Sequence, residues 1–165
     1  DDTIFDVKVL PDRNHDCLSH WGVAKEISAI FDLKIADKNL DKITSKPTSL
    51  EIDIMDEKCL RYMGRIVRNV KVGESPAWLK EKLNAIGQKS INNIVDIANF
   101  VMFDLGQPIH CFDLDKLASS SLIVRNGEDG EKITTLDKKE IKLEKYFIEL
   151  KQHQKLKHLI SVPKH

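Results

Sequence analysis

The stretch GQPIHCFD, residues 106–113, places a histidine beside a cysteine after a Gly-Gln-Pro turn. An imidazole next to a thiol suggests a base paired with a nucleophile. Neighbouring side chains of a strand, however, point to opposite faces, so His110 and Cys111 would not share one pocket. We therefore reject the His-Cys pair and keep His110 as either a binding residue or a structural one. Gly106 and Pro108 restrict the backbone and so fix how His110 is presented.

A second group of polar side chains lies near the start of the chain. His15, Cys17 and His20 are three possible zinc ligands, but no second pair accompanies them. Packing and helix capping explain the same residues equally well. The scattered acidic side chains give no acid–base pair of recognisable spacing: Asp96, Asp104, Asp113 and Asp115.

A series of arginines offers a different chemistry. Arg61, Arg65 and Arg68 form either a strip that contacts phosphates or the solvated edge of a strand. The chain has no glycine-rich phosphate loop and no G-x-S-x-G or H-E-x-x-H motif. It therefore carries no complete catalytic signature of its own.

Composition sets the class of protein. The 165 residues include 26 Lys and Arg and 26 Asp and Glu, so net charge gives no general attraction to nucleic acid or membrane. No apolar run reaches the length of a membrane span, and three separated cysteines suit a reducing compartment. We expect a cytoplasmic protein without a membrane partner. The start at Asp1 suggests a fragment.

Apolar and polar residues alternate in several segments, a pattern that predicts strands. These strands would help to position the candidate residues. The predicted strands are residues 3–10, 50–55, a segment within 59–73, 121–126, 131–136 and 140–143. Because helices and short strands do not alternate regularly, we expect an α+β fold with about three helices.

Apolar periodicity and capping signals predict the three helices. The first spans residues 17–31 with Asp16 as its N-cap, and Gly22 within it suggests close packing. The second spans 75–87, with Ser75 as N-cap and Pro76 at the first helical position. The third spans 90–105 and is closed by Gly106. Apolar faces are expected along the first and third helices, at Leu18, Val23, Ile27 and Ile30, and at Ile94, Ile97, Val101 and Leu105.

Four long motifs follow one another along the chain: PDRNHDCLSHWGVAKEISAI, RYMGRIVRNVKVGESPAWLKEKL, SINNIVDIANFVMFDLGQPIHCFDLDKL and IVRNGEDGEKITTLD. In this order they resemble the motifs of bacterial phenylalanyl-tRNA synthetase beta subunits, and the resemblance runs from about Phe5 to Asp137. The resemblance implies the end of an N-terminal structural domain followed by the first half of the family's editing module. It places these parts at residues 1–40 and 50–150. The polar composition between them predicts a linker at 41–49, and residues 151–165 form a basic tail rich in lysine and histidine.

The resemblance also implies an editing pocket that hydrolyses tyrosine wrongly attached to phenylalanine-specific tRNA. Asn99, Pro108 and His110 correspond to substrate-binding residues of that pocket, and Ala98 stands where the family often has threonine. Rejecting tyrosine requires a site that hydrogen-bonds one hydroxyl group, a task that polar groups perform far better than an apolar pocket.

The family's A-G-V-M-G-G-like loop, which forms the other wall of the pocket, is not found after the TTLD segment. We therefore expect an incomplete editing-module fold that is not catalytic alone. In the intact enzyme the alpha subunit would charge tRNA with ATP and magnesium, in a heterotetramer of two alpha and two beta subunits. No cofactor is expected in this part. The alternatives are a free-standing hydrolase of mischarged tRNA and an RNA- or protein-binding module that uses the arginines and the tail.

Overall fold

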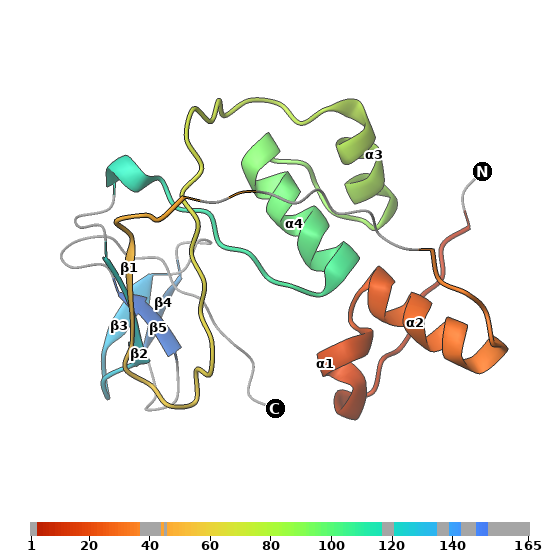
Figure 1. Cartoon of the computed structure of the whole chain (residues 1–165), viewed down its shortest axis with the longest axis horizontal. Coiled ribbons are helices and arrows are strands. Elements are labelled where there is room, and N and C mark those ends of the chain that lie inside the picture. The colour runs from red at the N-terminus through yellow and green to blue at the C-terminus, as the bar shows by residue number, and fades with distance from the viewer. Residues whose placement is uncertain are drawn as a thin grey trace. The chain divides into compact units, whose positions relative to one another are not determined.

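The residues fall into two compact units, each assembled from two separate stretches of chain (Figure 1). The computed structural model describes residues 3–36, 44, 46–116, 121–134, 139–142 and 148–151. Unit 1 combines Asp1–Ile43 with Asn69–Cys111, and unit 2 combines Thr44–Arg68 with Phe112–His165. These units are groupings by proximity in space, and the domain ranges expected from the sequence stay a prediction.

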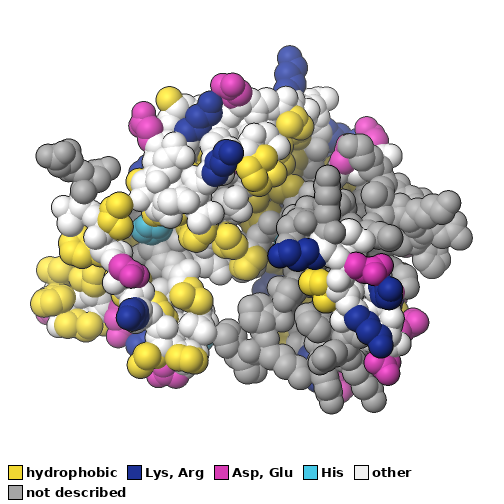
Figure 2. All heavy atoms as spheres, turned by 180° about the vertical axis from the view of Figure 1, so that it is seen from behind, with side chains coloured by type: hydrophobic (Ala, Val, Ile, Leu, Met, Phe, Trp, Pro, Cys, Tyr) yellow, Lys and Arg dark blue, Asp and Glu magenta, His cyan; other side chains and the backbone are white. Residues whose placement is uncertain are grey.

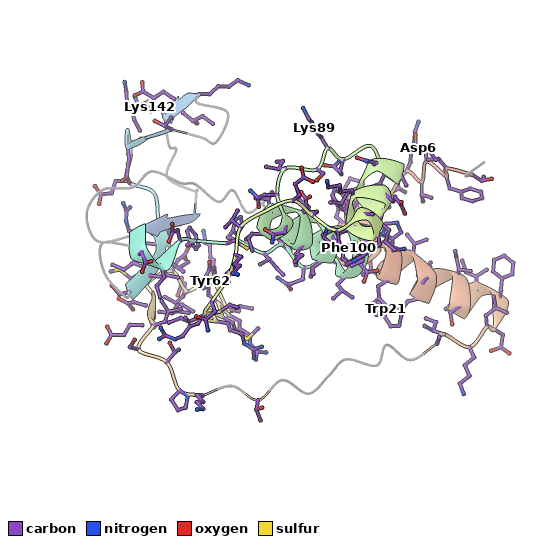
Figure 3. The ribbon with its side chains drawn as sticks, turned by 90° about the horizontal axis from the view of Figure 1, so that it is seen from above. Asp6, Trp21, Tyr62, Lys89, Phe100 and Lys142 are labelled. Atoms are coloured by element: carbon purple, nitrogen blue, oxygen red, sulfur yellow. The ribbon has the colours of Figure 1, made fainter. Side chains whose placement is uncertain are left out.

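Unit 1 is helical. A 3-10 turn at Pro11–Arg13 leads into α1 (Asn14–Cys17) and α2 (His20–Phe31), and the second stretch forms α3 (Ala77–Ala85) and α4 (Asn93–Leu105). Both α2 and α3 pack against α4. Leu79 and Leu83 of α3 are almost completely buried. Phe100 of α4, labelled in Figure 3, contacts Trp78 edge to face, with ring centroids 5.6 Å apart.

The predicted helix of residues 17–31 exists, but its expected start is wrong. The chain leaves the helical conformation at Leu18, and Ser19 becomes the N-cap of α2, accepting a hydrogen bond from the Gly22 N–H at 3.0 Å. Asp16 does not cap this helix and instead pairs with Arg13. The close packing expected at Gly22 is confirmed, because an added Cβ would lie 1.8 Å from the Asp16 carbonyl oxygen.

The other two predicted helices are confirmed with small changes at their starts. Pro76 precedes α3 rather than opening it, and Ser75 does not cap it. The start of α4 is capped by Asn92, whose side chain accepts from two backbone N–H groups. Gly106 ends α4 as expected, with a positive φ of 77° that favours glycine. The expected apolar face of α4 is only half covered, since Ile97 remains 49% exposed.

Unit 2 holds the strands. The parallel pair β1 (Glu51–Ile54) and β2 (Ser121–Asn126) is extended by antiparallel β5 (Ile148–Lys151), while β3 (Lys132–Thr134) and β4 (Glu140–Lys142) form a separate hairpin. A short 3-10 turn at Leu114–Lys116 precedes β2. Leu122 and Val124 of β2 are buried. The predicted α+β class is confirmed.

Two predicted strands are wrong, and one strand was missed. Residues 3–10 and 59–73 form no strand, because alternation alone provides no neighbouring strand to bond with. The strand β5 falls where the sequence predicted none. The strands predicted at 50–55 and 121–126 are observed as β1 and β2. Those predicted at 131–136 and 140–143 are observed at residues 132–134 and 140–142, whereas residues 135, 136, 143 and 152–165 lie outside the described residues.

Candidate functional site

The start of α4 is fixed by a buried carboxylate. Asp96 is 0% exposed and accepts hydrogen bonds from the hydroxyls of Ser75 and Ser90, both at 2.5 Å, and from the Ile91 N–H at 2.9 Å. Burial opposes ionisation of Asp96, but these hydrogen bonds outweigh it and lower its pKa below the ordinary value. The segment before α3, at Ser75, and the segment before α4, at Ser90 and Ile91, are thereby tied to one side chain.

A second polar residue reinforces this end of α4. Asn93 accepts from the Gly73 N–H at 3.1 Å and donates to the Lys71 carbonyl at 2.9 Å. Its own N–H also donates to the Gly73 carbonyl. The segment before α3 is therefore held against the first turn of α4 by side-chain and backbone bonds together.

Asn99, the first of the three residues assigned by resemblance, lies one turn further along α4. Its side chain is half-buried and makes no hydrogen bond to any described residue. An amide with free donors and a free acceptor can contact both the carbonyl and the hydroxyl groups of a substrate. The neighbouring Ala98 is buried, so it contributes packing only.

Pro108 and His110 follow the end of α4 in chain without regular secondary structure, and both are exposed. The strand geometry that was used to separate His110 from Cys111 is therefore not observed. Desolvation by the surrounding protein lowers the pKa of His110 below its ordinary value, which favours a neutral ring near pH 7. Unit 1 contains Asn99, Pro108 and His110 together, but no hydrogen bond joins them in the described part of the chain.

The adjacent Cys111 is exposed, and desolvation raises the pKa of its thiol. A thiol with a raised pKa is a poor nucleophile at neutral pH. The structure shows no hydrogen bond between His110 and Cys111, in agreement with the rejection of the pair.

The end of α4 is supported by α2. His20 Nδ1 lies 3.0 Å from the carbonyl oxygen of Phe103, in the last turn of α4. Three residues after Phe103, a Cβ on Gly106 would lie 3.2 Å from the Ser19 Oγ. The first turn of α2 thus contacts the point where the chain leaves α4 toward Pro108 and His110.

The His15, Cys17 and His20 set does not form a ligand group. Cys17 is buried, His15 lies 3.7 Å from an Asp16 oxygen, and His20 contacts α4. Across the described ranges, no three His, Cys, Asp or Glu side chains come together in a way that could hold a metal ion.

An ion-pair cluster supports the hairpin of α1 and α2. Arg13 contacts Asp16 at 2.7 Å and Glu26 at 2.6 Å. The Arg13 guanidinium lowers the pKa of Asp16 to about 2. No motif in the sequence pointed to this cluster, because Arg13 and Glu26 lie thirteen residues apart in different elements.

The arginine series lies in a part of unit 2 without regular secondary structure. Arg61, Arg65 and Arg68 are all exposed. Nearby, Gly64 lies close to the start of β1, because a Cβ there would approach Leu50 Cδ2 to 2.6 Å and Ile52 Cδ1 to 3.1 Å. The arginines therefore remain available to a phosphate-bearing partner, and the strand-edge interpretation is wrong.

A small hollow of about 120 Å³ lies in unit 1 between α1, the first turn of α2 and the end of α4. Its lining includes Trp21, Lys25 and Leu105, and it ends at Gly106. Because it does not include Asn99, Pro108 or His110, this hollow is not the pocket that the resemblance implies.

Two supporting residues were not recognised from the sequence. Asp96 had a signal, since an aspartate in the first turn of a helix after a Ser-Ile-Asn-Asn segment fits the N-terminal pattern of a helix. His20 had none, because its partner Phe103 is distant in the chain.

Comparison with known proteins identifies a consistent set of relatives. The family model of the B3/4 domain matches residues 58–161. The chain is similar to the phenylalanine–tRNA ligase beta subunit of Fusobacterium nucleatum, 48% identical over 140 residues that cover 82% of this chain and 17% of the relative. The corresponding protein of Carboxydothermus hydrogenoformans is 50% identical over 140 residues, covering 83% and 17%. That of Clostridium acetobutylicum is 39% identical over 159 residues, covering 94% and 20%.

The chain thus spans a fifth or less of the length of these curated relatives. In the described part of the chain, no helix has both the length and the apolar character needed to cross a membrane.

Proposed function

Because the chain belongs to the B3/4 domain family, we propose that it is part of the editing region of a phenylalanine–tRNA ligase beta subunit. The observation that carries this proposal is the segment from α4 to His110, which presents Asn99, Pro108 and His110 within unit 1. The identity of 39–50% to beta subunits, over most of the chain, supports it.

The chemistry of the segment suits hydrolysis of an aminoacyl ester. A neutral His110 near pH 7 can accept a proton from water or hold that water in place. The half-buried amide of Asn99 can bind the substrate carbonyl or the tyrosine hydroxyl. A committed polar contact of this kind discriminates tyrosine from phenylalanine more strongly than an apolar wall.

The isolated chain is expected to contribute to the pocket without completing it. In the intact enzyme, two alpha and two beta subunits would assemble, and the alpha subunit would charge phenylalanine-specific tRNA with ATP and magnesium. The B3/4 region would then hydrolyse tyrosyl-tRNA in the same assembly.

A chimeric enzyme tests this role. The matched segment of the Carboxydothermus beta subunit is replaced by this chain's sequence and assembled with its alpha subunit. We expect the chimera to release tyrosine from tyrosyl-tRNA, and His110→Ala to slow that release by about 100-fold or more while phenylalanine charging is unchanged. Lys89→Ala, an exposed change elsewhere in unit 1, serves as the control. Equal release by the His110→Ala chimera would refute the assignment.

The exposed arginines favour a second candidate, an RNA-binding module. If the isolated chain bound tRNA in a salt-dependent way, lost that binding in a triple Arg61, Arg65 and Arg68 substitution to Gln, and the chimera lacked tyrosine release, this candidate would replace the first. If the isolated chain itself released tyrosine, and His110→Ala removed that activity, the free-standing hydrolase would be correct.

A further inference from the structure

Helix α4 ends at Gly106, and its last turn has carbonyl groups without partners inside the helix. The Gly106 N–H satisfies one of them by donating to the Met102 carbonyl. The next carbonyl, that of Phe103, is contacted by His20 Nδ1 at 3.0 Å. The ring comes from α2, a helix distant in sequence, and no part of the proposed function uses it.

The nature of this contact follows from its atoms. A carbonyl oxygen only accepts hydrogen bonds, so Nδ1 must carry a hydrogen for the contact to be favourable. The neutral ring with its hydrogen on Nδ1 meets this condition, and so does the imidazolium. A donor at this place stabilises the end of a helix, where carbonyl groups concentrate partial negative charge.

The same turn of α2 makes a second contact with the exit of the chain from α4. Ser19 caps α2 through the Gly22 N–H and lies so close to Gly106 that a Cβ on the glycine would approach its Oγ to 3.2 Å. Gly106 has a φ of 77°, which sets the new direction of the chain. Four residues later the chain presents His110.

We propose that His20 is a positioning residue for the editing segment, since its Nδ1–H caps the last turn of α4 and fixes the path of residues 106–110. The proposal rests on the proposed function for its enzymatic consequence, but its structural content is independent. His20 acts through the backbone and does not touch substrate. Through His20, the α1–α2 hairpin would support catalysis by residues 106–110 of the same unit.

Nuclear magnetic resonance of the whole chain tests the bond directly. At pH 8, where free histidine is neutral, the ¹⁵N shifts of His20 are expected to show the hydrogen on Nδ1. A ring whose hydrogen sits on Nε2 would overturn the proposal, because such a ring cannot donate to Phe103.

Three variants test the positioning. In His20→Ala we expect the backbone resonances of residues 106–111 to shift and the pKa of His110 to rise toward its ordinary value as the segment loses its fixed path. His20→Asn, whose amide nitrogen sits close to the position of Nδ1, should restore the original shifts and pKa. His15→Ala removes an exposed imidazole of the same hairpin and should leave both unchanged. A His20→Ala chain with unaltered resonances and an unaltered His110 titration would refute the proposal.

The chimeric enzyme separates this proposal from the proposed function. If both are correct, His20→Ala lowers kcat for tyrosine release by about tenfold to 100-fold with little change in KM, and His20→Asn recovers most of it. If the variants move His110 as expected but no form of the chimera releases tyrosine, the positioning stands and the editing function fails. If the chimera is active and His20→Ala leaves kcat unchanged, the editing function stands and the positioning fails.

Discussion

The carboxylate of Asp96 shows how one residue can determine the geometry of a site without belonging to it. Its two oxygens accept hydrogen bonds from the Ser75 and Ser90 hydroxyls and from the Ile91 N–H inside unit 1. Removing such an acceptor leaves the buried Ser75 hydroxyl and two part-buried donors without this partner, which costs more than the bonds themselves contribute. Because Asn99 lies one turn away, the site depends on this carboxylate remaining ionised.

The pH dependence of stability follows from the lowered pKa of Asp96. A carboxyl group with a lower pKa in the folded state stabilises the fold above its unfolded value near 3.8, and this stabilisation is lost as pH falls through the folded pKa. We expect Asp96→Asn to reduce the free energy of unfolding at pH 6 by about 3 kcal/mol and to flatten its decline below pH 4.

Urea unfolding at several pH values measures this dependence. Glu81→Gln, an exposed change on α3, is the matched control and should keep the wild-type profile. Since Asp16 also titrates at low pH, the informative quantity is the difference between variant and wild type. An Asp96→Asn profile parallel to that of wild type would contradict the expectation.

At the scale of elements, the junction of α1 and α2 depends on the absence of a side chain at Gly22. Its backbone lies against the Asp16 carbonyl, with no room for a methyl group. This contact brings Ser19 into its capping position and turns α2 toward α4. The hairpin therefore combines a close backbone approach, a cap and the Arg13 ion pairs.

Substitution at two glycines tests this account. Gly22→Ala is expected to lower the free energy of unfolding by about 3 kcal/mol, because the backbone of α1 must move. Gly73→Ala, where no heavy atom lies within 4 Å of the added Cβ, should change it by less than about 0.5 kcal/mol. Equal melting temperatures for the two variants would contradict this expectation, because α1 and α2 would then accommodate a Cβ at residue 22 without loss of stability.

The elements differ in how far the sequence could predict them, for physical reasons. Helices α3 and α4 were recognised because signals at helix ends act locally; Gly106, for example, ends α4 with a positive φ angle. Ser75 has the local signal of a cap, but its hydroxyl is bound by the distant Asp96, so tertiary contact overrides the local preference. Residues 3–10 have the alternation of a strand without a partner. The pairing of β1 with β2 is not encoded in either segment alone.

The residues of the candidate site could be predicted only in part from the sequence. The resemblance indicated Asn99, Pro108 and His110, and their use in substrate binding stays a prediction. Local reasoning excluded the His110–Cys111 pair, although on the assumption of a strand that is absent. The supports at Asp96 and His20 depend on contacts between segments, which spacing along the chain does not determine.

At the scale of the whole molecule, many large apolar side chains of the described residues are exposed at the surface. In unit 1 they gather along the second half of α2 and beyond it, at Ile27, Ile30, Phe31 and Leu33 (yellow in Figure 2). Elsewhere, Phe5 is 82% exposed, and Leu60 of unit 2 is 93% exposed. A group of exposed apolar side chains such as that of α2 commonly marks an interaction site.

We therefore expect the purified chain to self-associate as its concentration rises. Sedimentation velocity over a concentration series measures this, and Ile30→Lys should shift the distribution toward the monomer. Lys25→Gln, on the same helix, changes a charge without adding or removing large apolar area and is the control. A chain that stays monomeric and melts cooperatively above about 60 °C would contradict the expectation.

The pairing of Glu51 with Ser121 has a consequence for the order in which the chain folds. The whole of α3 and α4 lies between the two strands, so the loop that the strands close is long and its closure carries an entropic cost. Contacts between α3 and α4 are close in sequence and form faster. On a ribosome, α3 and α4 would be complete while β1 still lacks its neighbour, and the sheet would form last.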